Sequence, residues 1–216
     1  MAARTALSRE RIVEAAIELL DTRGESGLTF RALSAQLKTG AGAIYWHVAN
    51  KDELLAAATD AVLAGLLTSG AAGATPQGEI RAVALGLFDA IDTHPWIGTQ
   101  LSRLASQSAT LQIFERLGRQ VQALGVPDGA QFNAASALLN YILGVAGQNA
   151  ANARSQEPGT SRSDVLGAES ATWADLDPAD FPFLHHVAGQ LREHDDREQF
   201  LAGVDLILAG ITVARR

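Results

Sequence analysis

The chain has 216 residues, of which 47% are hydrophobic and 19% are charged, and it contains no cysteine. This length and apolar content suit one good core or two small ones, and they exclude a mainly disordered chain. The lack of cysteine excludes a disulfide framework, a thiolate nucleophile and a cysteine-based zinc site. No secretory segment opens the chain and no apolar run reaches the roughly 18 residues that span a bilayer, so we expect a cytoplasmic protein with no membrane partner.

Acidic residues are distributed unevenly along the chain. The formal net charge is −7, which by itself argues against nucleic-acid binding, since phosphates attract clustered Lys and Arg. Residues 1–54 nevertheless hold seven basic and seven acidic side chains, so the excess acid lies beyond them. From Ser26 to Lys51 there is no Asp or Glu, whereas Arg31, Lys38 and Lys51 lie there. Such a local basic segment is typical of a small DNA-binding module on a larger body.

The N-terminal pattern predicts three short helices. Ser8 can cap a first helix that Gly24 stops, and Thr29 can cap a short second one. A tight turn near Lys38 precedes a third helix over about residues 40–46.

A long fourth helix is expected to connect two domains. Asn50 with Glu53 three residues later is typical of a helix start, and the apolar pattern continues over about residues 50–69. The glycine- and alanine-rich stretch 69–78 is the expected hinge. We therefore predict an N-terminal DNA-binding domain over residues 1–54.

The remaining chain, residues 75–216, is predicted to be a second helical domain. Its polar stretch 154–180 is rich in Pro, Gly, Ser and Asp and is expected to be a long loop or a partly disordered insertion. No strand alternation is seen, so the expected fold is all-α. Five helices are expected in this domain. The first ends before His94-Pro95 and the second ends before Gly125-Val126-Pro127. The other three run from about Asp128 to Ala150, near Phe183 to Leu191, and from about Asp196 to Val213.

A dense motif lies between Thr29 and Leu55. Its residues are Thr29, Arg31, Leu33 and Leu37, then Ile44-Tyr45-Trp46-His47-Val48, then Asn50-Lys51 and Leu54-Leu55. In this order and spacing they resemble the DNA-binding domain of the TetR family of repressors. The resemblance implies a helix-turn-helix reader of double-stranded DNA. The residues expected to contact DNA are Thr29, Arg31, Thr39, Gly40, Ala41, Ala43, Tyr45, Trp46, His47 and Lys51.

The resemblance assigns different roles to these residues. Tyr45, His47 and Lys51 would contact the phosphate backbone and so position the protein on the DNA. Arg31 would reach a base edge or a phosphate. Taken singly, each of these side chains could instead be an ordinary core or solvated residue that does not contact DNA. We expect one of Tyr45 and Trp46 to pack inward.

Two departures from the family pattern imply a sparse recognition surface. Lys38 stands where the family usually has the turn glycine, and Gly40 stands at a polar base-reading position. Direct readout would then depend on Arg31, Thr39 and methyl contacts from the alanines to thymine.

The second domain resembles, more weakly, the C-terminal domain of tetracycline-repressor-like proteins. His94-Pro95-Trp96, Leu124-Gly125, Tyr141-Ile142-Leu143-Gly144 and the terminal stretch 200–211 carry this resemblance. It implies that the long helix and the last helix form a four-helix bundle with a second copy, hence a homodimer. It also implies a small-molecule pocket, for which the candidate residues are Phe88, Ile91, Trp96, Leu104, Phe114, Asn140 and Gln148. Each of these could instead be an ordinary core residue.

The histidines do not predict a metal site or any other cofactor. Tetracycline-binding members hold a metal through a histidine, and Thr99 stands at that place here. His185 and His186 point about 100° apart on a helix, and His194 lies roughly two turns further on. With the neighbouring aspartates they are interpreted as solvated or pocket-edge groups.

These observations predict a ligand-responsive repressor that binds a palindromic operator as a dimer and is released by a small molecule. A second hypothesis is a helical ligand-binding or interaction protein with weakened DNA binding. An enzyme that uses the histidines is a third, but the chain has no G-x-S-x-G, H-E-x-x-H or phosphate-loop motif.

Overall fold

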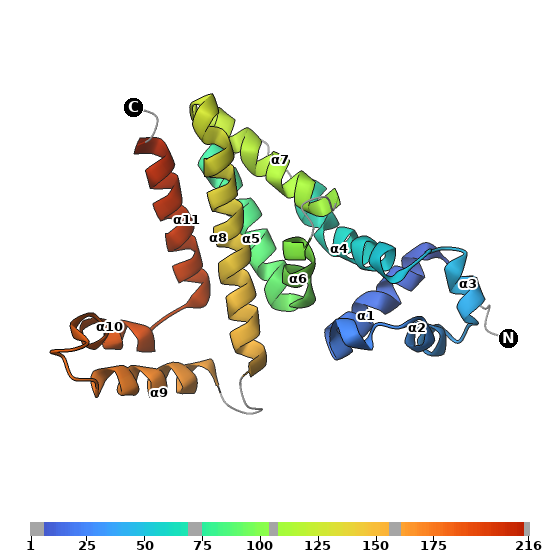
Figure 1. Cartoon of the computed structure of the whole chain (residues 1–216), viewed down its shortest axis with the longest axis horizontal. Coiled ribbons are helices and arrows are strands. Elements are labelled where there is room, and N and C mark those ends of the chain that lie inside the picture. Colours follow the sequence, from blue (N-terminus) through green and yellow to red (C-terminus); the bar gives the residue numbers. More distant parts are fainter. Residues whose placement is uncertain (1–6, 69–74, 104–107, 156–160, 214–216) are drawn as a thin grey trace.

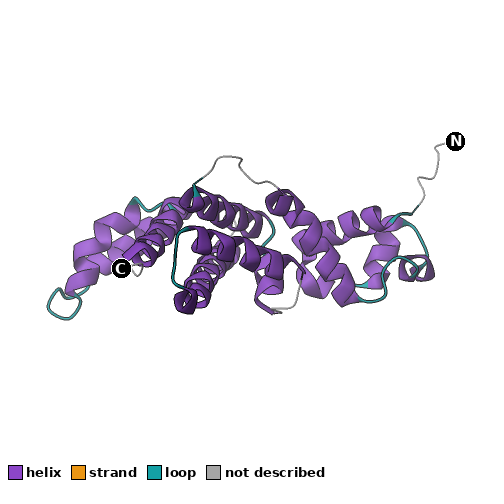
Figure 2. Cartoon of the chain, turned by 90° about the horizontal axis from the view of Figure 1, so that it is seen from above, coloured by secondary structure: helices purple, strands orange, loops and turns teal. Residues whose placement is uncertain are grey.

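A computed structural model describes residues 7–68, 75–103, 108–155 and 161–213. Over these ranges the chain is helical and has no strand, which confirms the all-α prediction (Figure 2). The helices are α1 (Arg9–Gly27), α2 (Phe30–Leu37), α3 (Ala41–Tyr45), α4 (Lys51–Thr68), α5 (Pro76–Thr93), α6 (Trp96–Arg103), α7 (Ser108–Ala123), α8 (Asp128–Ser155), α9 (Arg162–Ala174), α10 (Pro182–Arg192) and α11 (Asp196–Val213) (Figure 1). None of the described helices is both long and apolar enough to cross a membrane.

The predicted caps fix the first two helices. The Ser8 hydroxyl accepts a hydrogen bond from the Arg11 N–H at 3.3 Å, and the Thr29 hydroxyl accepts one from the Ala32 N–H at 3.1 Å. Gly24 has φ of 64° and interrupts α1, which resumes for one short turn and ends at Gly27. The helix thus breaks at the predicted residue but ends later.

One apolar core joins α1 to α4. Each helix contributes side chains that are at most 1% exposed, and burial of each Ile or Leu among them stabilises the unit by roughly 1.5–3 kcal/mol. The central members are Ile12 and Ala16 of α1, Leu33 of α2, Ile44 of α3 and Leu54 of α4.

The end of α4 is joined to the rest of the protein by a buried ion pair. Arg116 of α7 donates from Nε to the Glu79 carboxylate of α5 at 2.7 Å, and it also donates to the Leu66 carbonyl of α4. The two charged side chains are only 16% and 11% exposed. Three helices therefore meet at one guanidinium group.

The centre of the second domain is α8, which packs against α5, α7 and α11 (Figure 1). The Phe200 ring of α11 lies 4.8 Å from the Phe88 ring and 5.8 Å from the Tyr141 ring. The Tyr141 hydroxyl donates to the Phe200 carbonyl at 3.1 Å, and a Cβ at Gly203 would overlap that hydroxyl. Glycine at residue 203 therefore allows α8 and α11 to approach closely.

The prediction of a long loop over residues 154–180 is wrong. Helix α8 continues to Ser155, and α9 occupies Arg162–Ala174, while residues 156–160 lie outside the described chain. The polar residues that indicated a loop form a capping box, in which Ser161 and Asp164 satisfy each other's backbone N–H groups. Helix α9 then pairs with α10 as a helical hairpin that projects from the body (Figure 1).

Part of the predicted hinge at residues 69–78 is helical. Thr75 caps α5 by accepting a hydrogen bond from the Gly78 N–H at 3.1 Å, and Pro76 occupies the first helical position, so residues 76–78 are helical. Residues 69–74 lie outside the described chain.

Candidate nucleic-acid interface

Helices α2 and α3 form a pair joined by a turn at residues 38–40. Leu33 of α2 and Ile44 of α3 are both fully buried and hold the two helices together. The Thr39 N–H donates to the Ser34 carbonyl at 3.0 Å, which closes the end of α2. The result is a short, exposed helix held rigidly after a tight turn, which is the geometry of a helix-turn-helix.

Lys38 adopts a backbone conformation that favours glycine. Its φ is 52° and its ψ is 46°, and it is the only non-glycine residue with positive φ in the described ranges. A Cβ in this left-handed region costs about 1–2 kcal/mol. Lysine in place of the family's usual glycine at this turn therefore strains the backbone.

Replacing Lys38 with glycine is expected to raise the free energy of unfolding by about 0.5–1 kcal/mol. Glycine relieves the strain, although it loses more entropy on folding than lysine does. Urea unfolding at one fixed protein concentration measures the change. The control Lys38→Ala removes the same charge but keeps a Cβ, so it should give no gain, and equal shifts in the two variants would contradict the explanation.

The aromatic residues after the turn are exposed. Trp46 is 90% exposed and Tyr45 is 52% exposed. Tyr45 stacks on Phe30 of α2 with ring centroids 4.4 Å apart but stays more than half exposed, so neither aromatic is buried, although one of the pair was expected to pack inward. Two exposed aromatic side chains thus lie at the end of α3, where the sequence predicts contact with DNA.

The other predicted contact residues lie on the same two helices and their flanks. Thr29, Arg31, Gly40 and Ala41 are exposed, whereas Thr39, Ala43 and His47 are partly buried. No acidic residue occurs between Ser26 and Lys51, so the charged side chains of α2, α3 and the turn between them, Arg31 and Lys38, are both positive.

Lys51 is held by a contact that the sequence did not indicate. Its ammonium group donates to the Glu25 carbonyl of α1 at 2.6 Å, and the side chain is partly buried. Helix α4 is thus tied to the end of α1. A phosphate contact by Lys51 stays a prediction, and it would have to share or replace this hydrogen bond.

The predicted start of α4 combines a cap with an ion pair. The Glu53 N–H donates to the Asn50 side-chain oxygen at 2.8 Å, and the Glu53 carboxylate accepts from the Ala49 N–H at 2.8 Å and from Arg9 at 3.0 Å. The Ala49 N–H, and then Arg9, lower the pKa of Glu53 below its ordinary value. Asn50 and Glu53 thereby position the segment between α3 and α4.

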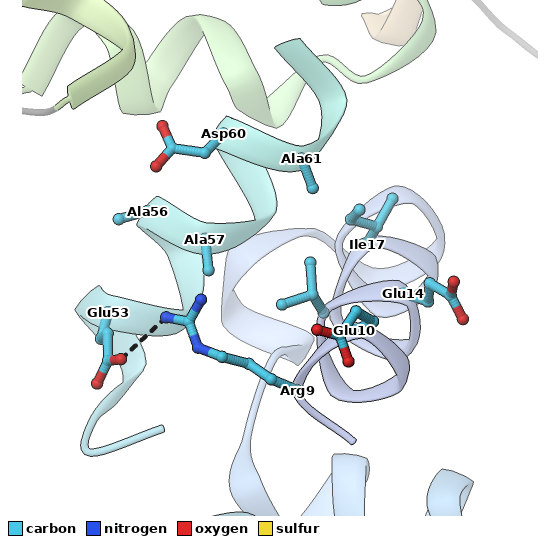
Figure 3. Close-up of a pocket in the computed structure, with 10 residues that line it drawn as sticks. Arg9, Glu10, Glu14, Ile17, Glu53, Ala56, Ala57, Asp60 and Ala61 are labelled. Atoms are coloured by element: carbon cyan, nitrogen blue, oxygen red, sulfur yellow. Dashed lines mark hydrogen bonds and ion pairs between the residues drawn. The ribbon is translucent and has the colours of Figure 1, made fainter. Parts of the chain in front are cut away.

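A groove of about 500 Å³ lies between α1 and α4 (Figure 3). Its lining includes four carboxylates, those of Glu10, Glu14, Glu53 and Asp60, against one arginine, Arg9. Burial raises the pKa of Asp60 above its ordinary value. A negative surface repels phosphates, so we expect DNA on the acid-free α2–α3 surface and not in this groove.

The N-terminal unit, residues 1–54, is also joined to the second domain, residues 75–216, by hydrogen bonds that the sequence did not predict. Asp21 of α1 accepts from the Trp96 indole at 2.8 Å and lies 2.8 Å from His94 Nδ1. One turn along α1, Glu25 accepts from the Gln100 amide at 3.1 Å. These contacts join residues 73 to 75 positions apart, so no local pattern could have indicated them.

Two family models together match most of the chain. Residues 12–58 match the family model described as bacterial regulatory proteins, tetR family, and residues 71–215 match that of the tetracyclin repressor-like C-terminal domain. The chain belongs to the TetR family of transcriptional regulators. Members of this family are DNA-binding regulators and not enzymes, which favours the repressor hypothesis over the enzyme hypothesis.

Individual TetR family proteins align over nearly the whole chain. An HTH-type transcriptional regulator of Saccharopolyspora erythraea is 30% identical, with 95% of this chain and 84% of that protein covered. The solved structure of the transcriptional regulator SCO7222, a TetR from Streptomyces coelicolor, is 57% identical with a TM-score of 0.88, and 98% and 100% of the two chains are covered. The structure of BioQ with its natural double-stranded DNA operator is 25% identical with a TM-score of 0.65, and the coverage is 96% and 99%.

The predicted pocket residues of this TetR family regulator are not gathered around one cavity. Phe88, Ile91 and Trp96 are buried and Phe114 is partly buried, but Asn140 and Gln148 are exposed on α8, and Leu104 lies outside the described residues. Phe88 lines a cavity beside α8 and α11, whereas Trp96 lines a different one beside α1.

The histidines of the second domain are also separated. His185 and His186 are exposed on α10, whereas His194 lies beyond the end of that helix, so the helical spacing assumed for it does not apply. His194 Nε2 lies 2.8 Å from the Asp196 carboxylate. In the described ranges, no group of three or more His, Asp or Glu side chains is placed to hold a metal ion.

Proposed function

We propose that this TetR family regulator is a cytoplasmic, ligand-responsive repressor that binds a palindromic operator as a homodimer and is released by a small molecule. The observation that carries the proposal is the acid-free, exposed α2–α3 surface, with Trp46 protruding from it. BioQ, which shares this fold, has been solved on its own double-stranded operator.

In the proposed complex, α3 enters the major groove and few side chains read bases. Arg31 is exposed on α2 and is the residue best shaped to bind guanine through two hydrogen bonds. Thr39 and the methyl groups of Ala41 and Ala43 add short contacts. Phosphates would be held by donors around them, for which the candidates are Thr29, the Gly40 backbone, Tyr45, Trp46, His47 and Lys51.

Replacing Arg31 with alanine is expected to weaken operator binding by roughly tenfold to a hundredfold and binding to random DNA much less. The reason is that a base contact is lost on the operator, whereas random sequence loses one charge only. Titration of both duplexes at one fixed salt concentration measures the two losses. Arg192→Ala on α10 removes the same charge far from the reader and should change neither, and equal losses for Arg31→Ala on both duplexes would count against the base contact.

The homodimer is proposed to form through α8 and α11. Leu206 lies in the middle of α11 and is 75% exposed in the single chain, on the side away from the buried Val204 and Leu208. Gly144 of α8 and Gly210 of α11 have open space around them, so a second copy could approach both helices closely. Two readers held at a fixed separation would match the two halves of a palindrome.

The ligand response is proposed to pass through the contacts between the two units, residues 1–54 and 75–216. Asp21 and Glu25 join α1 to His94, Trp96 and Gln100, and Arg116 joins α4 to α5 and α7. A ligand that shifts α5 or α6 would therefore move both helices that support the reader. Coupling requires different ligand affinities for the free and the operator-bound dimer, so equal affinities measured by calorimetry would refute it.

A second candidate function is ligand or protein binding with weakened DNA binding. It is favoured by the shortness of α3, which has five residues and contains Gly42. Glycine inside a helix costs about 1 kcal/mol relative to alanine. A mobility shift with the DNA upstream of the protein's own gene separates the two candidates.

A further inference from the structure

A polar cavity of about 420 Å³ lies apart from the reader, where α5, α8, α9 and α11 meet. Cavities of this volume accommodate small molecules. Only one of its lining residues, Phe88, is apolar. The lining residues are Phe88, Asp89 and Asp92 of α5, Asn149 of α8, Arg162 of α9, and the run His194 to Arg197 at the start of α11.

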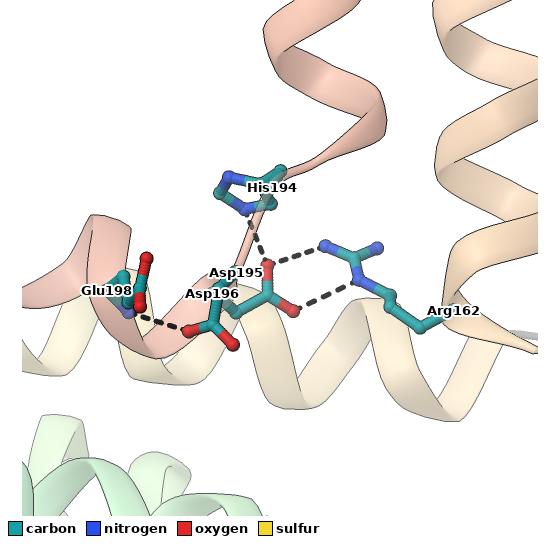
Figure 4. Close-up of polar contacts among 5 residues, drawn as sticks. All are labelled: Arg162, His194, Asp195, Asp196 and Glu198. Atoms are coloured by element: carbon teal, nitrogen blue, oxygen red, sulfur yellow. Dashed lines mark hydrogen bonds and ion pairs between the residues drawn. The ribbon is translucent and has the colours of Figure 1, made fainter.

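Most of the charges in this cavity already have partners. Arg162 binds the Asp196 carboxylate through two hydrogen bonds of 3.0 and 2.6 Å, and His194 binds the same carboxylate at 2.8 Å (Figure 4). Burial acts to raise the pKa of Asp196, but Arg162 and His194 hold it below its ordinary value. Asp195 accepts from the Glu198 N–H at 2.8 Å and so caps α11 (Figure 4).

Asp92 is exposed at the rim of the cavity and has no partner of opposite charge among the described residues. It occupies the last turn of α5, at the negative end of the helix dipole, and that turn holds no basic residue. Its neighbour Asp89 is paired with Arg197 at 3.3 and 3.2 Å, whereas no described cation pairs with Asp92. The lining has four aspartates against two arginines and one histidine, so the cavity carries an excess of negative charge, whether or not His194 is protonated, that a cation would offset.

Asn149 adds a second unsatisfied group to the same cavity. Its amide nitrogen is buried and has no hydrogen-bond partner among the described residues. A buried donor without an acceptor costs about 1–3 kcal/mol, and an oxygen atom supplied from the cavity would recover that cost. Phe88 contributes an aromatic ring, to which cations are attracted.

We infer that this cavity binds a small, hydrophilic amine that also carries hydroxyl or carbonyl oxygens, such as an amino sugar. The ammonium group lies at Asp92, and an oxygen of the ligand accepts from Asn149. Flat apolar molecules do not fit a lining in which eight of the nine residues are polar or charged.

The position of the cavity gives this ligand a route to the reader, and this part of the inference rests on the proposed function. Asp92 lies two residues before His94, which contacts Asp21 of α1. An amine that neutralises the last turn of α5 therefore acts next to the contact that joins α5 to α1.

Calorimetric titration with glucosamine tests the site, and glucose serves as the uncharged analogue. The wild-type protein is expected to bind glucosamine saturably. Glucose should bind at least about tenfold more weakly, because it has no ammonium group to form the charge-assisted contact with Asp92. Asp92→Asn should weaken glucosamine binding by a similar factor without harming the fold, because Asp92 is exposed and the change breaks no ion pair of the described residues. The matched control Asp175→Asn, at the exposed end of α9, should bind like the wild type.

A second variant tests the oxygen contact. Asn149→Ala should weaken binding of glucosamine but not of cyclohexylamine, which has no oxygen. Absence of saturable glucosamine binding, equal affinity for glucose, or equal affinity in Asp92→Asn would overturn the assignment. The same preparations are titrated with operator DNA. Intact operator binding without amine binding rejects this site alone, whereas absence of operator binding rejects the proposed function.

Discussion

Replacing Arg116 with leucine is expected to lower the free energy of unfolding by about 3–5 kcal/mol, because the Glu79 carboxylate is then left buried without a cation. The leucine also cannot donate to the Leu66 carbonyl, so α4 loses its contact with α7 at this point. Chemical denaturation measures the loss at a fixed total protein concentration, because dimerisation contributes to the stability.

Two controls separate this buried pair from surface charge. Arg119→Leu, on the same helix, breaks the ion pair between Arg119 and Glu115, whose two side chains are 72% and 65% exposed respectively. This change should lower the free energy of unfolding by about 0.5 kcal/mol or less. The double variant Arg116→Leu with Glu79→Leu should recover much of the loss, because no charge is then stranded. A loss at Arg116 no larger than that at Arg119 would contradict this account.

Replacing Leu206 with glutamate is expected to convert the dimer to a monomer and to lower operator affinity by about a hundredfold or more. The substitution places a charge at the centre of the proposed α8–α11 interface, where its desolvation has no compensating partner. A monomer also loses simultaneous binding of the two half-sites. Analytical ultracentrifugation gives the oligomeric state, and a titration on operator DNA gives the affinity.

Leu111→Glu is the matched control for this change. Leu111 is 54% exposed on α7, which is not one of the two helices of the proposed interface, so the variant should remain dimeric and bind the operator normally. A Leu206→Glu protein that stays dimeric would show that the interface lies elsewhere.

Features determined by neighbouring residues could be predicted from the sequence. Ser8, Thr29 and Asn50 accept hydrogen bonds from N–H groups three residues on, so a short pattern contains all the necessary information. The start of α9 is equally local, but Ser161 and Asp164 were interpreted as loop composition and not as a cap. Helix α6 was missed because it follows directly on His94-Pro95, which indicated only an end.

Features that depend on distant contacts could not be predicted. Lys51 was expected to face phosphate, but its ammonium group meets the Glu25 carbonyl, 26 residues away. Trp96 was assigned to a small-molecule pocket with Phe88, but it lines a separate cavity beside α1, where its indole donates to Asp21. Apolar periodicity indicates which helix face is buried but not whether a core or a cavity covers it. The candidate pocket residues are therefore the least determined part of the prediction.

The most direct test of the central proposal is a titration of the dimer with the DNA upstream of its own gene, beside a shuffled duplex of equal length and salt concentration. A dimeric repressor should bind one palindrome in that DNA about a thousandfold or more tightly than the shuffled duplex. Equal affinity for the two duplexes would contradict the account, since the α2–α3 surface would then read no sequence.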